Sequence, residues 1–482
     1  AIRDTNTPPL LFSITRHFLA EKKQKRRPSM HLAVLTIGGI VFATAPAAAA
    51  PSVGAAFSGG GLTAFIETLC TLEALAESPG AARWTSNDWT AAVNSGGTLG
   101  YMLAQSLSAG VLVYPPFSAM GKLTYTALSQ KYEGAASQKW FAEVLDVVPS
   151  IMARTRAERE VGKLSGAGWW ETALETALLA YGLKGDDIHG GVRPAVAGLS
   201  VLRASSAPIQ RRDTGATTGV MRYALGAGGR ANLLPGEYDF ASGLVRVPGN
   251  SSAAWASATP FSAIQGGSFS SAFWGVSIVE LSKIEYALSK GFLIDLPASA
   301  GGDAFYALDG GMVDTTGIAA QLRRKVDRLV VFLGQNNDLT TASNATLAYL
   351  FGVETPTDAQ NTLEGPRLAH VFPTALYAAV IANLTNAGGD ATFAATLRNV
   401  SVLANSYLGV EAYTLESVTI VGNQPLGAFF DTFADEQVKA HVDPKFPNNF
   451  PVGMSTFDAN LMCLWSAYRV QKLETVLSAL WV

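Results

Sequence analysis

Two short apolar runs near the start of the chain each end in a glycine-rich turn. The run Val53–Phe57 is followed by Ser58-Gly59-Gly60-Gly61, and the run 90–93 by Asn94-Ser95-Gly96-Gly97. After each turn, apolar residues recur three and four positions apart: Phe65, Ile66, Leu69, Leu72 and Leu75 after the first, and Leu99, Met102 and Leu103 after the second. This is the spacing of a helix face. The pattern therefore predicts two units of buried strand, sharp turn and helix.

A third apolar run, 304–308, leads to Asp309 and the turn Gly310-Gly311. The later part of the chain continues the alternation of strand and helix patterns. Strands are predicted at 195–202, at 328–334 and within 410–421, a helix that Pro373 interrupts within 367–384, and a closing helix at 456–477. The alternation favours an α/β protein in which glycine turns follow buried strands.

The residues at these turns are suited to acyl transfer. Ser95, at a sharp turn between strand and helix, is presented to whatever lies above the sheet. Backbone N–H groups of Gly59-Gly60-Gly61 can face the same point, because glycine lets a backbone approach a reacting oxygen closely. Ser95 needs a base, and Asp309 is the candidate. Burial at a strand end raises the pKa of a carboxylate towards the range in which it accepts a hydroxyl proton near neutral pH.

The order and setting of these motifs resemble the patatin-like and cytosolic phospholipase A/lysophospholipase superfamily. The resemblance covers 52–105 and 304–334, and it rests on these matches: Ser58-Gly59-Gly60-Gly61, Ser95-Gly96-Gly97, Asp309-Gly310-Gly311 and the run 326–332. It implies a three-layer α/β/α fold with a mainly parallel central sheet and an inserted partial lid. It also implies a Ser–Asp dyad without histidine, in which Ser95 is the nucleophile and Asp309 the general base.

The same resemblance implies that Gly59, Gly60 and Gly61 donate to the oxyanion and that no metal or organic cofactor takes part. The implied reaction is hydrolysis of carboxylic esters of phospholipids or lysophospholipids at a membrane or lipid surface, through an acyl-serine intermediate.

Two positions depart from the family pattern. Val93 stands where a glycine usually lies two residues before the serine, and Leu62-Thr63 stand where cytosolic members carry a phosphate-binding arginine. A threonine cannot hold a phosphate bidentately. Two alternatives therefore stay open, a catalytically silent lipid-binding relative and an esterase that acts on other substrates.

Other chemistries compete for these residues. Gly59-x-Gly61-x-x-Ala64 is a relaxed dinucleotide fingerprint, but that motif predicts an acidic residue at the end of the next strand, where the sequence has Asn94-Ser95. A Ser-His-Asp triad would need one of the histidines beyond the serine, which are His189, His370 and His441. His189 has a loop setting suited to catalysis, yet a solvated loop histidine is the favoured interpretation.

Composition narrows the classes of function. The 482 residues are 48% hydrophobic and 15% charged, which permits a large core, and the net charge of −3 gives no reason to expect a nucleic-acid partner. The cysteines are Cys70 and Cys463. Cys70 lies on the apolar face of a predicted helix, which favours a buried thiol over a disulfide.

The segment 1–50 is typical of a targeting sequence. A basic stretch, 22–27, precedes the apolar run 32–44, and small residues at 45–50 offer a cleavage site. The run is short for a bilayer span of about 20 residues. A secretory signal is the preferred interpretation, with an uncleaved anchor and a basic disordered tail as alternatives. We therefore expect a secretory or extracellular location with membrane contact, and one catalytic domain, 51–482, in which 114–300 contains the lid.

Overall fold

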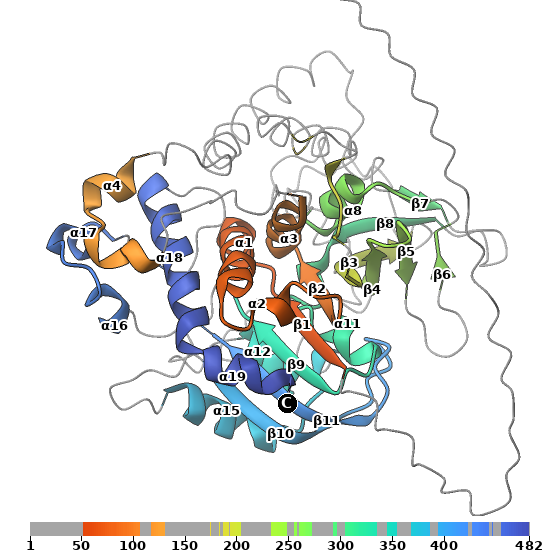
Figure 1. The fold of residues 1–482 in the computed structure, drawn as a ribbon. Helices are drawn as coiled ribbons and strands as arrows, with labels where there is room; N and C mark the ends of the chain where they lie inside the picture. Colours follow the sequence, from red (N-terminus) through yellow and green to blue (C-terminus); the bar gives the residue numbers. More distant parts are fainter. Residues whose placement is uncertain are drawn as a thin grey trace, which may run out of the picture. The chain divides into compact units, whose positions relative to one another are not determined.

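One mixed sheet organises the part of the chain that the computed structural model describes (Figure 1). The described residues are 52–106, 117–130, 174, 183, 187–191, 193–203, 233–247, 255–257, 260–271, 293–295, 304–334, 345–353, 368–385, 394–422, 427–442, 446 and 455–481. They belong to one unit, Ala50–Val482. The predicted targeting segment 1–50 and most of the predicted lid lie outside the described residues.

The described sheet has eleven strands with a parallel centre. Its main path is β10 (Ala394–Val402), β11 (Tyr413–Val421), β9 (Arg328–Phe332), β1 (Val53–Phe57), β2 (Trp89–Asn94), β3 (Ala195–Arg203), β4 (Leu233–Asp239), β5 (Leu244–Val247) and β6 (Trp255–Ala256). β8 (Ala304–Asp309) pairs with β3 and with β7 (Leu293–Asp295). The five central strands from β11 to β3 run parallel, and antiparallel strands extend both margins. The predicted α/β fold with a mainly parallel central sheet is confirmed.

Helices cover both faces of the sheet, because successive strand side chains point to opposite sides. Phe57 and Phe332 pack on one side with α1 (Gly61–Glu77), α3 (Gly96–Ser106) and α18 (Thr456–Lys472), which Figure 1 shows together. Ala56 and Val331 pack on the other side with α11 (Ile318–Arg323), α12 (Ala345–Leu350) and α15 (Ala375–Thr385). These are the three layers that the sequence predicts.

Shorter elements complete the described chain. They are α2 (Ala81–Trp84), η1 (Phe117–Lys122), α4 (Tyr125–Ser129), α8 (Ala263–Ser270), η6 (Gly310–Met312), α16 (Gly427–Phe430), α17 (Glu436–Ala440), α19 (Glu474–Ser478) and η7 (Ala479–Trp481). Strand β10 was not predicted. It is an edge strand with several exposed or half-buried positions. Its sequence therefore lacks the continuous apolar run that marks β1 and β9.

A disulfide between Cys70 and Cys463 joins α1 to α18 across 393 residues of sequence. The prediction of a free thiol is therefore wrong, although the predicted burial of Cys70 is correct. The pairing depends on two helices near opposite ends of the chain, which only the fold brings together. A buried ion pair between Glu67 and Arg469, with 3.5 Å between oxygen and nitrogen, links the same two helices.

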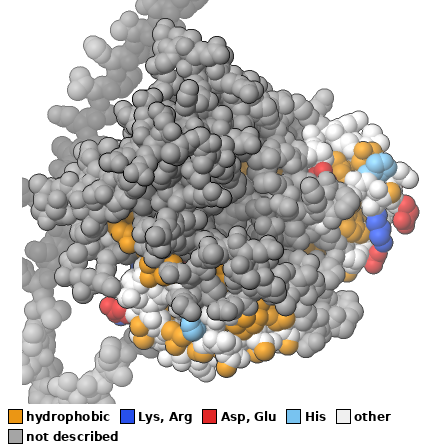
Figure 2. All heavy atoms as spheres, turned by 180° about the vertical axis from the view of Figure 1, so that it is seen from behind, with side chains coloured by type: hydrophobic (Ala, Val, Ile, Leu, Met, Phe, Trp, Pro, Cys, Tyr) orange, Lys and Arg blue, Asp and Glu red, His pale blue; other side chains and the backbone are white. Residues whose placement is uncertain are grey.

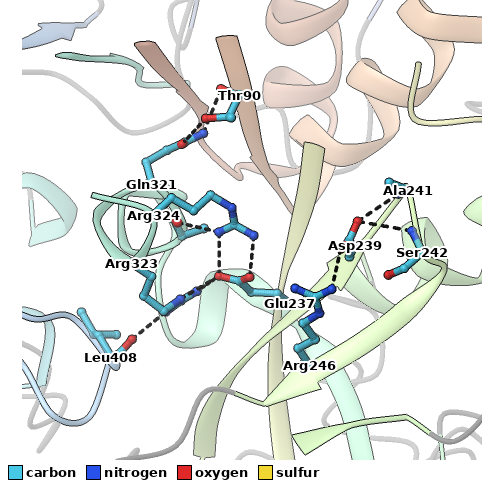
Figure 3. A network of polar contacts seen from close by, with 11 residues as sticks. Thr90, Glu237, Asp239, Ala241, Ser242, Arg246, Gln321, Arg323, Arg324 and Leu408 are labelled. Carbon is cyan, nitrogen blue, oxygen red and sulfur yellow. Dashed lines mark hydrogen bonds and ion pairs between the residues drawn. The ribbon is translucent and has the colours of Figure 1, made fainter. Parts of the chain in front are cut away.

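On the other side of the sheet, a buried carboxylate ties β4 to α11 (Figure 3). Glu237 accepts hydrogen bonds from Arg323 and Arg324, with 2.9 Å between Arg324 Nη2 and Glu237 Oε2. Arg323 also donates to the carbonyl of Leu408 at 2.6 Å. The cluster holds a sheet strand, a helix and a loop in one arrangement.

The surface seen from behind carries few charged side chains among its described atoms, and hydrophobic ones gather towards its lower edge (Figure 2). Helix α15 also exposes apolar side chains, among them Ala375, Ala378 and Ala379. This agrees with the low charged fraction of the chain.

Candidate active site

Ser95 occupies the strained turn between β2 and α3. Its φ of 49° lies in the left-handed region, which residues other than glycine adopt rarely. Such a conformation costs on the order of 1 to 3 kcal/mol and persists only where the surroundings hold it. The turn places the hydroxyl at the end of the parallel strands, the edge at which α/β proteins gather functional side chains.

The glycine turn that follows β1 packs directly against this serine. A Cβ at Gly59 would lie 2.7 Å from Cβ of Ser95, and one at Gly96 would lie 1.9 Å from the carbonyl oxygen of Gly61. No side chain fits at either position without movement of the backbone. The two glycine motifs found in the sequence therefore pack directly against each other.

Strand β3 explains how Asp309 reaches Ser95. Along one edge of β3, Gly198 pairs with Asn94 of the parallel strand β2, and the next residue, Leu199, pairs with Asp309 of the antiparallel strand β8. Strand β4 occupies the opposite edge. Strands β2 and β8 thus meet end to end along β3, and each delivers its polar residue to the meeting point.

The two side chains are in hydrogen-bond contact. Oγ of Ser95 donates to Oδ2 of Asp309 at 2.7 Å, and Oδ1 of Asp309 accepts the N–H of Gly311 at 2.7 Å. Both residues are buried, with exposed fractions of 6% for Ser95 and 2% for Asp309. The contact with Gly311 fixes the carboxylate so that its other oxygen points at the serine hydroxyl.

The predicted oxyanion donors divide into two groups. The N–H of Gly59 donates to the carbonyl of Thr315 at 2.7 Å, so in this structure it is not free for a substrate oxygen. Gly60 and Gly61 have φ values of 146° and 62° and begin α1, which has no side-chain cap. Within the described part of the chain, neither of their N–H groups donates a hydrogen bond. Helix N-termini with free N–H groups favour negative charge.

None of the described histidines contacts Ser95 or Asp309. His189 is exposed, and its Nδ1 accepts the N–H of Gly191 at 3.0 Å. His370 and His441 form ring hydrogen bonds with the carbonyls of Phe372 and Gln437. The described part of the chain therefore gives no support to a Ser-His-Asp triad.

Polar residues around the turn were missed by the sequence analysis. The side-chain amide of Asn94 donates to the carbonyl of Asp314 and so ties the serine turn to the loop after Asp309. Ser270, 175 residues further along the chain, accepts the N–H of Ser95. Asn94 belongs to the turn motif found in the sequence, but nothing in that motif predicts its contact with Asp314, and Ser270 lies in no recognisable motif.

The two departures from the family pattern are buried positions. Val93 is enclosed between β1 and β3 and belongs to the core. Thr63 is fully buried in the first turn of α1. A side chain at position 63 therefore faces the protein interior in this structure, which weakens the expectation that an arginine there would reach a substrate phosphate.

Within the described ranges, no helix has the length and apolar character to cross a bilayer. The same residues contain no cluster of His, Cys, Asp and Glu side chains with the geometry of a metal site.

No protein-family model matches the sequence, and no curated protein matches it either. Among solved structures, the chain is similar to human GIVD cytosolic phospholipase A2, with a TM-score of 0.44 and 10% identity over 89% of this chain and 62% of that chain. The same enzyme in complex with methyl gamma-linolenyl fluorophosphonate gives a TM-score of 0.40 and 12% identity over 89% of this chain and 59% of that chain. The chain spans about three fifths of the length of these structures. Similarity at this level assigns no family to the chain.

Proposed function

We propose that the chain is a serine acyl hydrolase in which Ser95 is the nucleophile and Asp309 the general base. The observation that carries the proposal is the 2.7 Å hydrogen bond between Ser95 Oγ and Asp309 Oδ2, made by a serine with φ of 49° at the end of a parallel strand. A hydroxyl held by a buried carboxylate at such a turn has the arrangement of an activated nucleophile and its base.

In the proposed reaction, Asp309 Oδ2 takes the proton of Ser95 Oγ as the oxygen attacks the ester carbonyl carbon. The tetrahedral intermediate collapses, the alcohol leaves with the proton from Asp309, and an acyl-serine is formed. Water then attacks the acyl carbonyl and gives its proton to Asp309. The resulting intermediate releases the carboxylic acid, and Ser95 Oγ recovers its proton.

The N–H groups of Gly60 and Gly61 are the proposed oxyanion donors. They lie at the N-terminus of α1, next to the turn that packs against Ser95, and the helix dipole adds to their attraction for negative charge. Gly59 has a different role in this proposal, because its N–H holds Thr315 and its missing side chain allows the close contact with Ser95.

The proposed substrates are carboxylic esters of phospholipids or lysophospholipids. Support comes from the motif resemblance over 52–105 and 304–334. The proposed location is secretory or extracellular, with contact to a lipid surface. It is supported by the basic and apolar pattern within 1–50 and by the disulfide Cys70–Cys463, since disulfides persist in oxidising compartments.

The test compares wild-type protein with Ser95→Ala, using a fluorophosphonate probe and lysophosphatidylcholine as substrate. We expect the probe to label wild-type protein and not the variant, and free fatty acid to be released by wild-type protein alone. Circular dichroism should show the same fold for both. Labelling without release of fatty acid would favour an esterase for other substrates. Absence of labelling, combined with binding to phospholipid vesicles, would favour the silent lipid-binding alternative.

A further inference from the structure

Ser270, the last residue of α8, makes three polar contacts from a fully buried position. Its Oγ donates to the carbonyl of Gly198 at 2.8 Å, accepts the N–H of Ser95 at 3.2 Å and lies 2.7 Å from Oγ1 of Thr98. A serine hydroxyl has one donor and two acceptor sites. All three are used if Thr98 is the donor in its contact, so no capacity is left for water or a substrate.

The contact with Ser95 acts on the strained part of the turn. The N–H of Ser95 is fixed by Ser270, while its Oγ is fixed by Asp309. A residue with φ of 49° needs such restraints, because relaxation of its backbone would rotate the side chain away from its partner. The two contacts therefore hold the serine from opposite ends.

Helix α8 is itself held firmly. Its first turn carries a capping box in which Ser262 and Gln265 bond reciprocally to each other's backbone. The ring of Tyr238 packs so closely on the helix that a Cβ at Gly266 would lie 2.2 Å from it. Because α8 is packed so tightly, Ser270 has little freedom to move with the Ser95 turn if that turn shifts.

We propose that Ser270 is a positioning residue for Ser95, whose hydroxyl holds the N–H of the serine and keeps its Oγ directed at Asp309. The effect on turnover rests on the proposed function, whereas the effect on the geometry of Ser95 does not. Because the N–H of Ser95 is given to Ser270, it does not serve the oxyanion. In the proposed reaction, the N–H groups of Gly60 and Gly61 therefore stabilise the oxyanion.

The test compares Ser270→Thr with Ser270→Val. Both variants place a branched side chain of nearly the same shape in a filled site, and they differ because Val has a methyl group where Thr keeps the hydroxyl. In Ser270→Val the buried N–H of Ser95 loses its acceptor. A lost hydrogen bond of this kind, where it also holds the transition state, lowers the rate constant by roughly tenfold to a hundredfold. We expect kcat and the fluorophosphonate labelling rate of Ser270→Val to fall below those of Ser270→Thr by that factor, with KM unchanged.

Ser268→Ala is the matched control. Ser268 is a buried serine of the same helix, and its Oγ donates to the carbonyl of Gln265 at 2.8 Å, inside α8. This variant should keep the wild-type labelling rate, even if its melting temperature falls. Equal rates for Ser270→Thr and Ser270→Val would overturn the proposal.

Crystal structures of the two Ser270 variants separate this proposal from the proposed function. The Thr variant should keep the hydrogen bond between Ser95 and Asp309, and the Val variant should lose it as the φ of Ser95 leaves the left-handed region. That result would support positioning even if wild-type protein neither reacted with the probe nor hydrolysed an ester, an outcome that would overturn the proposed function alone. An unchanged Ser95 in the Val variant would contradict positioning.

Discussion

Ser95 donates its hydroxyl hydrogen to Asp309 across 2.7 Å, although 214 residues separate the two in the sequence. The contact follows from the topology of β3, which pairs with a parallel strand and then an antiparallel strand along the same edge. The loops that follow those two strands meet where the strands end. The contact between Ser95 and Asp309 therefore depends on an antiparallel strand, β8, at the margin of the parallel part of the sheet.

Replacement of Asp309 by Asn should remove the proposed general base and keep the fold. The amide has nearly the shape of the carboxylate, and its oxygen can still accept the N–H of Gly311, but it cannot take the proton of Ser95. A general base contributes about 10²- to 10⁴-fold to a rate. We expect kcat on a lysophospholipid to fall by that factor with an unchanged melting temperature. Activity within threefold of wild-type would show that another group is the base.

Replacement of Gly59 by Ala should displace Ser95 through a steric clash, without removing any polar group from the site. The added Cβ would lie 2.7 Å from Cβ of Ser95, so the turn or the serine must move. Overpacking of this kind typically costs about 1 to 3 kcal/mol of stability. Displacement of Ser95 should also lower the rate at which the probe labels the protein. Gly427→Ala is the control, because no described atom beyond its chain neighbours and its own helix lies within 4 Å of the added carbon. Thermal unfolding and probe labelling measure the two effects, and equal behaviour of the two variants would contradict the contact.

The sequence was most informative where one segment contains its own signal. Val53–Phe57 and Gly61–Glu77 follow from an apolar run, a glycine turn and helical spacing, and the structure places both elements there. The motifs also placed Ser95 and Asp309 at strand ends. Contacts between segments far apart in the sequence carried no such signal. The pairing of Cys70 with Cys463 and the contact between Ser95 and Ser270 depend on elements that only the fold brings together.

Stability should fall in acid because of Glu237. Burial alone would raise the pKa of this carboxyl, but the charges and hydrogen bonds of Arg323 and Arg324 outweigh burial and lower the pKa from 4.5 to about 2. A group whose pKa is lower in the folded state stabilises the protein above its unfolded pKa. That stabilisation is lost as the pH falls from about 4.5 to about 2, and its size is on the order of 3 kcal/mol.

Urea unfolding of wild-type protein and Glu237→Gln between pH 7 and pH 3 tests this assignment. At pH 7 the variant should be less stable by about 3 to 5 kcal/mol, because two arginines lose a buried partner. The difference should narrow as the pH approaches 3. Glu416→Gln removes a carboxylate from a more exposed ion pair with Arg328 and should change stability by about 1 kcal/mol or less. A difference between wild-type and Glu237→Gln that stays constant over the whole pH range would rule out this pKa shift.

An arginine at position 63 should damage the protein without improving the recognition of phosphate. Thr63 is fully buried, so Thr63→Arg would place an uncompensated charge in the interior, which costs about 3 to 5 kcal/mol. Helix α1, which follows the glycine turn, contains no lysine or arginine, so wild-type protein should discriminate weakly between a lysophospholipid and an uncharged monoacyl ester of the same chain length. A charge-assisted hydrogen bond is worth about 1.5 to 3 kcal/mol, or roughly tenfold to a hundredfold in kcat/KM, so a preference of that size would be easy to detect. We expect the ratio of kcat/KM for the two esters to lie near one in wild-type protein. The melting temperature of Thr63→Arg should drop, and Thr63→Ser is the control that retains the hydroxyl.

A strong phosphate preference in wild-type protein would mean that a basic residue elsewhere binds the head group. A stable Thr63→Arg variant that gained such a preference would show that position 63 faces the substrate after all.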